Sequence, residues 1–421
     1  MRTSPRKPLS PEAAAVLSAF SGSAFGGSVF GGSVVSRRTL MRGAAATGAL
    51  AALGGSLAAC GTEGTKQTEA SCVSEDKSAT EKTLAFSNWP LYIDVDEKDE
   101  SKRPTLLAFE SQTGIKVTYT EDINDNNEFF GKINKQLGDC QAIDRDIVTM
   151  TDWMAGKLVR LGWMQKLDKA NLPNVAANLA ASFKGPGWDP QNDYSVVWQA
   201  GLTGVAYNAK VAKEVRTINE LLTRPDLKGK VTMLSEMQDT MALMLLANGN
   251  DPANFTEAQF DAALTKLDAA VKSGQIRKFT GNDYAQDLDK GDIAACIAWS
   301  GDVIQLGFEN ENVKWVNPEE GLTYFTDNMM VPNKATHKAN AEKLMNYYYD
   351  PKVAAELAAW VNYICPVEGA QAEMAKIDKE LAENPLIFPS AADMAKAKDF
   401  QSLTDAEEKA YQEKFQKVIG A

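Results

Sequence analysis

The sequence predicts an α/β fold with a mostly parallel sheet, and three observations support this class. Short apolar or alternating runs at residues 84–86, 115–119 and 146–150 have the length and composition of strands. A helical pattern at residues 104–112 separates the first two runs and stops before Gly114, and strand–helix alternation of this kind is typical of parallel sheets. The length of 421 residues exceeds that of an ordinary single domain and favours two lobes.

The same alternation continues in the second half of the chain. Residues 230–234, 293–299 and 323–331 are predicted strands, and residues 255–273 form an amphipathic helical pattern. The part that follows is predicted to be mainly helical. Residues 189–208 differ, because two β-like runs interrupted by glycines have no helix between them. We interpret this stretch as an extended crossover between two lobes.

Composition limits the possible functions. Hydrophobic residues make up 44% of the chain, and the net charge is −12. The first sixty residues carry six basic groups and one acidic group, so the remainder has a net charge of −17. An acidic body argues against a nucleic-acid partner and is compatible with a cationic ligand. The single histidine, His337, excludes two-histidine metal motifs, and its polar surroundings predict an inert surface residue. We predict no metal and no cofactor.

Residues 1–60 have the features of an export signal. Arg37 and Arg38 precede a weakly apolar Ala/Gly/Leu run, as in a twin-arginine (Tat) signal peptide. The run is too short for a stable membrane span, and its end at residues 57–60 (LAAC) resembles a bacterial lipobox. This resemblance implies cleavage before Cys60 and lipidation of its thiol, although Cys60 as a plain cysteine after an ordinary signal is the alternative.

A lipobox at this place predicts a lipoprotein anchored to the outer, periplasmic or extracytoplasmic, face of the cytoplasmic membrane. Residues 61–82 are polar and poor in aromatic side chains, which predicts a flexible tether between the lipid and the folded body. An exported protein meets an oxidising compartment. Cys72 and Cys140 lie in polar, loop-like settings and are predicted to pair, whereas Cys296 lies in an apolar run and is predicted to be a buried free thiol.

Aromatic and acidic residues follow the predicted strands. Carboxyl ends of parallel strands meet at the edge of a sheet where ligands bind, so these side chains could converge there. Aromatic faces with carboxylates between them would hold an aliphatic cation. The alternative for each residue is an ordinary core aromatic or a solvated surface acid. The candidates in chain order are Trp89, Tyr92, Thr151, Trp153, Glu236, Asp239, Trp299, Asp302, Phe325 and Asp327.

Five segments, taken together in order and spacing, resemble a known family. They are residues 88–92 (NWPLY), 112–117 (QTGIKV), 165–169 (QKLDK), 192–195 (NDYS) and 291–303 (GDIAACIAWSGDV). The chain resembles the periplasmic polyamine-binding proteins of ABC importers, of the spermidine/putrescine type, over nearly all of residues 84–401. The resemblance implies a type II periplasmic binding protein fold, in which two α/β lobes joined by hinge strands close around one ligand. We expect residues 83–203 and 328–365 in lobe 1, and residues 204–327 and 366–421 in lobe 2.

The resemblance carries over to the candidate residues one by one. All ten match ligand-binding positions of the family, Glu236 less surely than Asp239. It adds Tyr363, which matches a hinge-region aromatic, and Gln401, a looser match near the end. Three features depart from the family pattern: Leu91 and Ser235 stand where some members have an acid, and residues 94–100 are an acidic insertion. These departures leave the particular amine open.

The function implied is that of a binding protein rather than an enzyme. It would capture putrescine or spermidine and deliver it to an ABC permease in the membrane. A different small solute, such as an amino-acid-like compound or an opine, is one alternative. An exported enzyme that uses paired carboxylates is another, which the sequence disfavours because no nucleophile motif accompanies the acids.

The lipobox interpretation can be tested at Cys60. We expect the mature protein to begin at Cys60 and to partition with membranes, because a lipidated thiol anchors it there. Replacing the thiol, Cys60→Ser, should release the protein into the soluble fraction or stall its processing. Mass spectrometry that finds an unmodified mature N-terminus at another residue would contradict the interpretation.

Overall fold

The computed structural model describes residue 72 and residues 74–96, 98–99 and 101–420. The predicted signal segment 1–60, with the lipidation site Cys60, and tether residues 61–71 lie outside the described residues. Within the described part of the chain, no helix is both long and apolar enough to cross a membrane.

In the described residues, nine strands form one mixed sheet with the order β2-β1-β3-β9-β4-β7-β5-β6, and β8 pairs with β4. Strand pairs that involve neither β4 nor β9 are parallel. Strands β4 and β9 run antiparallel to each of their neighbours. The strands are β1 (Thr83–Asn88), β2 (Lys116–Glu121), β3 (Ile147–Thr151), β4 (Ser195–Asn208), β5 (Val231–Leu234), β6 (Ile276–Thr280), β7 (Ala295–Trp299), β8 (Val313–Val316) and β9 (Thr323–Met330).

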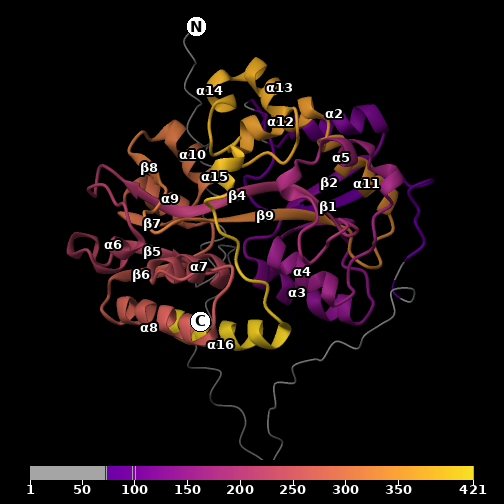
Figure 1. Cartoon of the computed structure of the whole chain (residues 1–421). Coiled ribbons are helices and arrows are strands. Elements are labelled where there is room, and N and C mark those ends of the chain that lie inside the picture. The colour runs from indigo at the N-terminus through magenta and orange to yellow at the C-terminus, as the bar shows by residue number, and fades with distance from the viewer. Residues whose placement is uncertain (1–71, 73, 97, 100, 421) are drawn as a thin grey trace, which may run out of the picture.

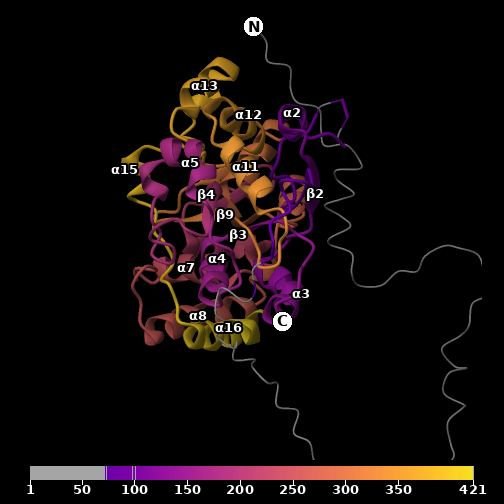
Figure 2. The ribbon, with the colours of Figure 1, turned by 90° about the vertical axis from the view of Figure 1, so that its right-hand side faces the viewer.

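Helices cover the sheet from two sides, with α2 and α12 above it and α4, α8 and α16 below it (Figures 1 and 2). Strands β1 to β3 and their helices form the first lobe, and β5 to β8 with theirs form the second. The helices are α2 (Pro104–Thr113), α3 (Asn126–Gly138), α4 (Asp152–Arg160), α5 (Pro173–Asn178), α6 (Ile218–Thr223), α7 (Met237–Ala247), α8 (Glu257–Lys272), α9 (Tyr284–Lys290), α10 (Ser300–Glu309), α11 (Lys338–Tyr348), α12 (Pro351–Val361), α13 (Ala370–Ile377), α14 (Lys379–Ala382), α15 (Ala391–Met394) and α16 (Asp405–Ile419).

The expected crossover at residues 189–208 contains the long strand β4, which joins the two lobes. The sequence pattern suggested that Gly201 and Gly204 interrupt this strand. They do not, because each glycine makes room for an aromatic ring. A Cβ atom on Gly201 would lie 2.4 Å from Cζ of Phe325, and one on Gly204 would lie 2.7 Å from the indole of Trp315. These glycines therefore mark close packing within a continuous strand.

The C-terminal part of the chain corrects the expected lobe boundary. Residues 366–421 were expected in lobe 2, but α13 packs on α12 of the first lobe. Val367 also pairs with Leu179 in an isolated bridge on that side. By contrast, α16 packs on α8 of the second lobe. The chain therefore crosses to the second lobe after α14, by way of α15 and the extended segment that follows it in Figure 1.

The expected tether is shorter than residues 61–82. Cys72 and Cys140 form a disulfide, which confirms their predicted pairing. Beyond it, Asp76 accepts a hydrogen bond from the backbone N–H of Ala339, and the Ser78 hydroxyl accepts one from the N–H of Asn340. These contacts bind the segment to the first turn of α11, whose N–H groups have no partner within the helix. The folded body thus begins no later than Cys72.

His337 is not the inert surface residue that its neighbours in the sequence suggest. Its Nδ1 lies 3.1 Å from the Asp146 carboxylate, and its Nε2 lies 3.0 Å from Oε2 of Glu81. Partial burial opposes protonation, but the hydrogen bond and charge of Glu81, with those of Asp146, outweigh it and raise the pKa of His337. Cys296 is a buried free cysteine, as predicted, and Cys365 is another.

The disulfide predicts a stability difference. It closes a loop with a sequence separation of 68 residues, and cross-links of this kind typically contribute about 2–4 kcal/mol by restricting the unfolded chain. Reduction with dithiothreitol should lower the free energy of unfolding in urea by that amount. The double variant Cys72→Ser/Cys140→Ser should start at the lower value and not respond to the reductant. Equal curves with and without the reductant for the unmodified chain would show that the bond contributes nothing.

Candidate ligand-binding site

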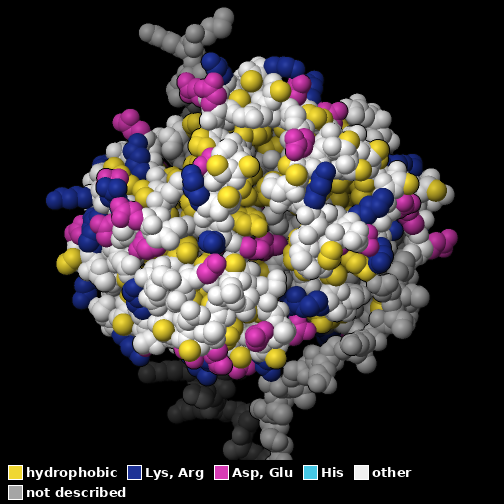
Figure 3. All heavy atoms as spheres, in the orientation of Figure 1, with side chains coloured by type: hydrophobic (Ala, Val, Ile, Leu, Met, Phe, Trp, Pro, Cys, Tyr) yellow, Lys and Arg dark blue, Asp and Glu magenta, His cyan; other side chains and the backbone are white. Residues whose placement is uncertain are grey.

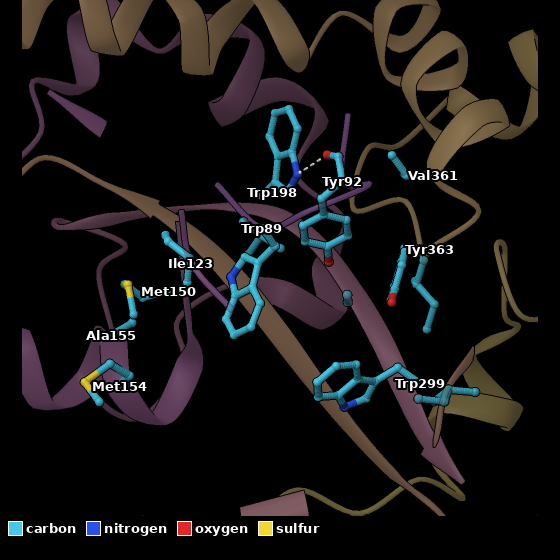
Figure 4. Close-up of a cluster of buried hydrophobic side chains, with 14 of the residues drawn as sticks. Trp89, Tyr92, Ile123, Met150, Met154, Ala155, Trp198, Trp299, Val361 and Tyr363 are labelled. Atoms are coloured by element: carbon cyan, nitrogen blue, oxygen red, sulfur yellow. Dashed lines mark hydrogen bonds between the residues drawn. The ribbon is translucent and has the colours of Figure 1, made fainter. Parts of the chain in front are cut away.

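Trp89 and Tyr92 lie directly after β1, where the chain turns through Pro90 and Leu91. Leu91 has a φ of 57°, so the turn is tight and both rings point back into the protein. Trp89 donates its indole N–H to the carbonyl of Thr149 at 3.1 Å. The carbonyl of Tyr92 accepts the indole N–H of Trp198, also at 3.1 Å (Figure 4). Hydrogen bonds therefore fix the ring of Trp89 and the backbone of Tyr92 at the sheet.

Asp327 lies at the centre of the sheet on β9, opposite Thr151 of β3. Its Oδ2 accepts a hydrogen bond from the Tyr92 hydroxyl, and its Oδ1 accepts one from the Thr151 hydroxyl, both at 2.8 Å. Only 4% of the residue is exposed. Burial raises the pKa of Asp327 to about 6, the two hydrogen bonds act against this, and the charge of Asp239 adds to it. Both donors are uncharged, so they leave the negative charge of Asp327 unneutralised.

Asp239 approaches the same space from the first turn of α7 in the second lobe. The Thr203 hydroxyl and the Trp299 side chain donate hydrogen bonds to its carboxylate. Burial raises the pKa of Asp239 to about 6 in spite of these donors. Asp239, which is half-buried on α7, and Asp327, which is buried on β9, are therefore close enough for one to raise the pKa of the other.

Glu236 connects the lobes through Asn126. The backbone N–H of Asn126 and its side-chain amide donate hydrogen bonds to Oε1 of Glu236, at 3.1 and 2.9 Å. The same amide donates to the Thr151 hydroxyl at 2.8 Å. Burial, with the charges of Asp125 and Asp239, raises the pKa of Glu236 well above its usual value. Asn126 begins α3 of the first lobe and Glu236 precedes α7 of the second, so this contact spans the cleft.

Asp302 lies behind the aromatic rings and orients two tyrosines. The hydroxyl groups of Tyr363 and Tyr284 each donate to its carboxylate at 2.7 Å, and Asn282 donates at 3.2 Å. Tyr363 in turn meets the ring of Tyr92 edge to face, with 4.8 Å between centroids. Burial raises the pKa of Asp302. Asp302 therefore fixes the tyrosine side chains around the site and does not itself line the cavity.

The structure brings most of the candidate residues together around one small cavity of about 30 Å³. We call this cavity and its lining the aromatic box. Figure 4 shows Trp89, Tyr92, Trp299 and Tyr363 around a common space. The lining consists of Trp89, Pro90, Tyr92, Thr151, Glu236, Asp239, Asn282, Trp299, Phe325, Asp327 and Tyr363.

Besides Asp302, which lies behind the rings, two further candidates do not line the aromatic box. Trp153 and Gln401 line a larger cavity of about 310 Å³ that adjoins it. Gln401 is held in a loop contact, because its Oε1 accepts the N–H of Phe255 and its own N–H donates to the carbonyl of Pro252. The looser family match at Gln401 therefore corresponds to a position outside the box.

Sequence reasoning missed four polar residues that shape the site: Asn126, Thr203, Asn282 and Tyr284. None of them follows a predicted strand directly or belongs to a motif, so no local signal marked them. Their role appears only when the register of β4 and the cross-lobe contacts are known. The described residues contain no group of three or more His, Cys, Asp or Glu side chains that could hold a metal ion.

Acids and aromatic rings that line one small cavity suit a cationic solute. Two lobes joined by long strands, with such a site between them, define a solute-binding protein. The chain belongs to the bacterial extracellular solute-binding protein family, whose model matches residues 106–389.

Individual relatives agree with this assignment. The chain is 30% identical over 339 residues to the putrescine-binding periplasmic protein PotF of Escherichia coli, covering 76% of this chain and 86% of PotF. It is 26% identical over 339 residues to the spermidine/putrescine-binding periplasmic protein of the same organism, covering 80% and 91%. Its fold is similar to that of the spermidine/putrescine transporter substrate-binding protein PotD of Streptococcus pneumoniae, with a TM-score of 0.65 and 21% identity over 80% of this chain and 98% of that one.

The buried acids predict how stability depends on pH. Between the usual Asp pKa of about 4 and about 6, folded Asp239 and Asp327 hold protons that the unfolded chain has lost. The folded form then binds more protons, so the free energy of unfolding of the ligand-free protein falls as pH rises through this window. Asp327→Asn should remove one contribution, on the order of 3 kcal/mol, and make the fall shallower.

Urea denaturation at several pH values between about 4 and 7 measures this. Asp144→Asn is the matched control, because Asp144 is exposed and has a positive φ that asparagine tolerates. Equal slopes for the unmodified chain and Asp327→Asn would show that Asp327 is not a raised-pKa group.

Proposed function

We propose that this protein captures a polyamine, putrescine or spermidine, outside the cytoplasm and delivers it to an ABC permease. Asp327 carries the proposal, because it is a buried carboxylate among aromatic rings with only uncharged donors around it. An ammonium group placed there would neutralise Asp327 and contact ring faces at the same time. The names of the relatives, which bind putrescine or spermidine, support the same ligand class.

The number of acids in the aromatic box suits a ligand with more than one charge. Asp327 enters from β9 and Asp239 from α7, and each has a raised pKa of about 6. One monovalent cation would leave a second carboxylate of the aromatic box without a counter-ion, which is unfavourable where little water can enter. A diamine brings two ammonium groups joined by methylenes, and Trp89, Trp299 and Phe325 offer apolar faces to these methylenes.

Lobe closure supplies the mechanism. Asn126 and Glu236 bond across the cleft, and the aromatic box retains only about 30 Å³ of free space. The described form is thus a closed one, and a ligand must enter while the lobes are apart. Because the box exists only when both lobes contribute, a dication binds the closed form better and shifts the equilibrium towards it. The bond between Asn126 and Glu236 also stabilises the closed form.

We also propose that the protein is a lipoprotein attached through Cys60, and that it catalyses no reaction. The lipobox-like residues 57–60 support the anchor. Membership in a solute-binding family supports binding without chemistry. The tyrosine hydroxyls that donate to Asp327 and Asp302 also have a structural role, because these hydrogen bonds hold the tyrosine rings in place.

Removing the charge of Asp327 tests this proposal. Asp327→Asn keeps the shape but leaves an ammonium group without its counter-ion. Removal of one partner of a desolvated pair costs on the order of 3–5 kcal/mol, which is about two to four decades in affinity. Asp302→Asn should weaken binding less, because Asp302 acts through Tyr363 and Tyr284.

Calorimetric titration with putrescine and spermidine measures these losses, with Asp144→Asn as the control that should bind like the unmodified chain. Affinities of Asp327→Asn within about threefold of the unmodified chain for both amines would remove Asp327 from the site. Failure of the unmodified chain to bind either amine would refute the proposed ligand class.

A further inference from the structure

The beginning of α3 contacts the second lobe at more than one point. The lobes meet across the middle of the face shown in Figure 3, where hydrophobic and acidic side chains lie. At this junction the Ser235 hydroxyl donates a hydrogen bond to Oδ2 of Asp125 at 3.3 Å. A Cβ atom on Gly281 would lie 3.2 Å from the carbonyl oxygen of Asn124, so the two backbones are close there. Because these contacts join the two lobes, they must break when the lobes separate.

The side chain of the next residue, Asn126, uses all of its polar atoms at this junction. Its Nδ2 atom donates to the Thr151 hydroxyl at 2.8 Å and to the Glu236 carboxylate at 2.9 and 3.2 Å. Its Oδ1 atom accepts the backbone N–H of Thr151 at 3.2 Å. An ionised carboxylate can only accept and a backbone N–H can only donate, so the reverse orientation of the amide would leave both without a partner. Asn126 is 0% exposed, so no water replaces these bonds.

The orientation of Asn126 decides where the hydroxyl proton of Thr151 points. An amide N–H only donates, so the Thr151 oxygen accepts this bond and cannot give its own proton to Asn126. That proton goes to Oδ1 of Asp327, at 2.8 Å. The hydrogen bonds therefore run in one direction, from Asn126 through Thr151 to Asp327. Bonds in such a chain polarise and strengthen one another.

The bond from Thr151 favours the charged form of Asp327. Burial raises the pKa of Asp327 to about 6, and the hydrogen bonds from Thr151 and Tyr92 act against this. The titratable groups that act on Asp327 are all acids, namely Tyr92 after β1, Asp152 on α4, Asp239 on α7 and Tyr363 after α12. Thr151 is the donor that Asn126 connects to Glu236 of the second lobe.

We propose that Asn126 is a positioning residue for amine binding: Glu236 fixes its amide when the lobes close, and the amide directs the Thr151 hydroxyl to Asp327. This inference rests on the proposed function and adds the regulation of the same site. Asp327 then reaches its full affinity for an ammonium group only in the closed form.

The consequence concerns release of the ligand. Opening of the lobes removes Glu236 from Asn126, so the amide can rotate and the Thr151 hydroxyl can turn away. Asp327 loses a donor to its charged form and holds the ammonium group less tightly. Separation of the lobes therefore lowers the affinity of the site as well as exposing it.

A double-mutant cycle tests whether Asn126 acts through Thr151. Asn126→Ala removes the amide, and Thr151→Val removes the hydroxyl at nearly constant volume. Each variant should bind putrescine and spermidine about tenfold more weakly in calorimetric titrations. The double variant should lose about tenfold to thirtyfold instead of about a hundredfold, because both changes break the same chain of hydrogen bonds.

A second contact between the lobes provides the matched control. Glu408 on α16 of the second lobe pairs with Lys157 and Arg160 on α4 of the first, at 2.7 and 3.6 Å. Glu408→Gln weakens these ion pairs outside the chain of hydrogen bonds to Asp327. Its loss of affinity should therefore multiply fully with that of Thr151→Val.

The pH profile of amine affinity separates positioning from structural support. The ammonium group binds charged Asp327, so affinity falls as pH drops through the pKa of that carboxyl. Loss of the Thr151 donor raises this pKa, so the fall should begin at higher pH in Asn126→Ala and Thr151→Val. Glu408→Gln should lower affinity without moving the profile. Thr151→Ser keeps the hydroxyl and should keep the profile of the unmodified chain.

The outcomes separate the two proposals. Losses that multiply fully in the Asn126→Ala/Thr151→Val variant, or an unmoved pH profile, would overturn the positioning role while amine binding in the aromatic box stands. If Asn126→Ala does not fold, Asn126→Ser takes its place in the cycle, because one hydroxyl proton cannot serve both Thr151 and Glu236. If the unmodified chain binds neither amine, the proposed function falls, and the positioning role falls with it.

Discussion

The burial of Asp327 at the junction of the two lobes is the constraint on which the rest of the site depends. A carboxylate at the centre of a sheet is unfavourable unless its oxygens are hydrogen-bonded. Here one oxygen is met by Tyr92 from the loop after β1 and the other by Thr151 at the end of β3. Both donors are uncharged, so they satisfy the carboxylate oxygens of Asp327 without neutralising its charge. The pairing of β3 with β9 places Thr151 directly opposite Asp327.

The remaining walls follow from this position. Phe325 is two residues before Asp327 on the same strand, and its ring occupies the space that Gly201 leaves on β4. Tyr363 packs over Gly301, where a Cβ atom would lie 2.2 Å from its ring, and its hydroxyl is held by Asp302. Small residues in the strands and the helix start therefore decide where large rings can lie. The rings in turn keep water away from the carboxylate and strengthen its interaction with a cation.

Much of this arrangement could be predicted from the sequence, because strand ends are local features. Alternating runs located the strands, and the residues after them include most of the aromatic box. Long-range contacts could not be predicted in the same way. Asn126 gave no signal, since an asparagine near a helix start is usually a cap, and its bond to Glu236 depends on how the lobes meet. The glycines of β4 suggested breaks because their neighbours in space were unknown. The packing of α13 on α12 is likewise set by tertiary contacts.

The attachment of the N-terminal segment has a mechanical consequence. Cys72 is bonded to Cys140, next to the end of α3, while Asp76 and Ser78 hold the start of α11. All of these partners belong to the first lobe. A pull on whatever precedes Cys72 is therefore transmitted to that lobe alone and does not load the strands that join the lobes. The second lobe can therefore still rotate relative to the first. Tension on the N-terminal side does not open or close the cleft between them.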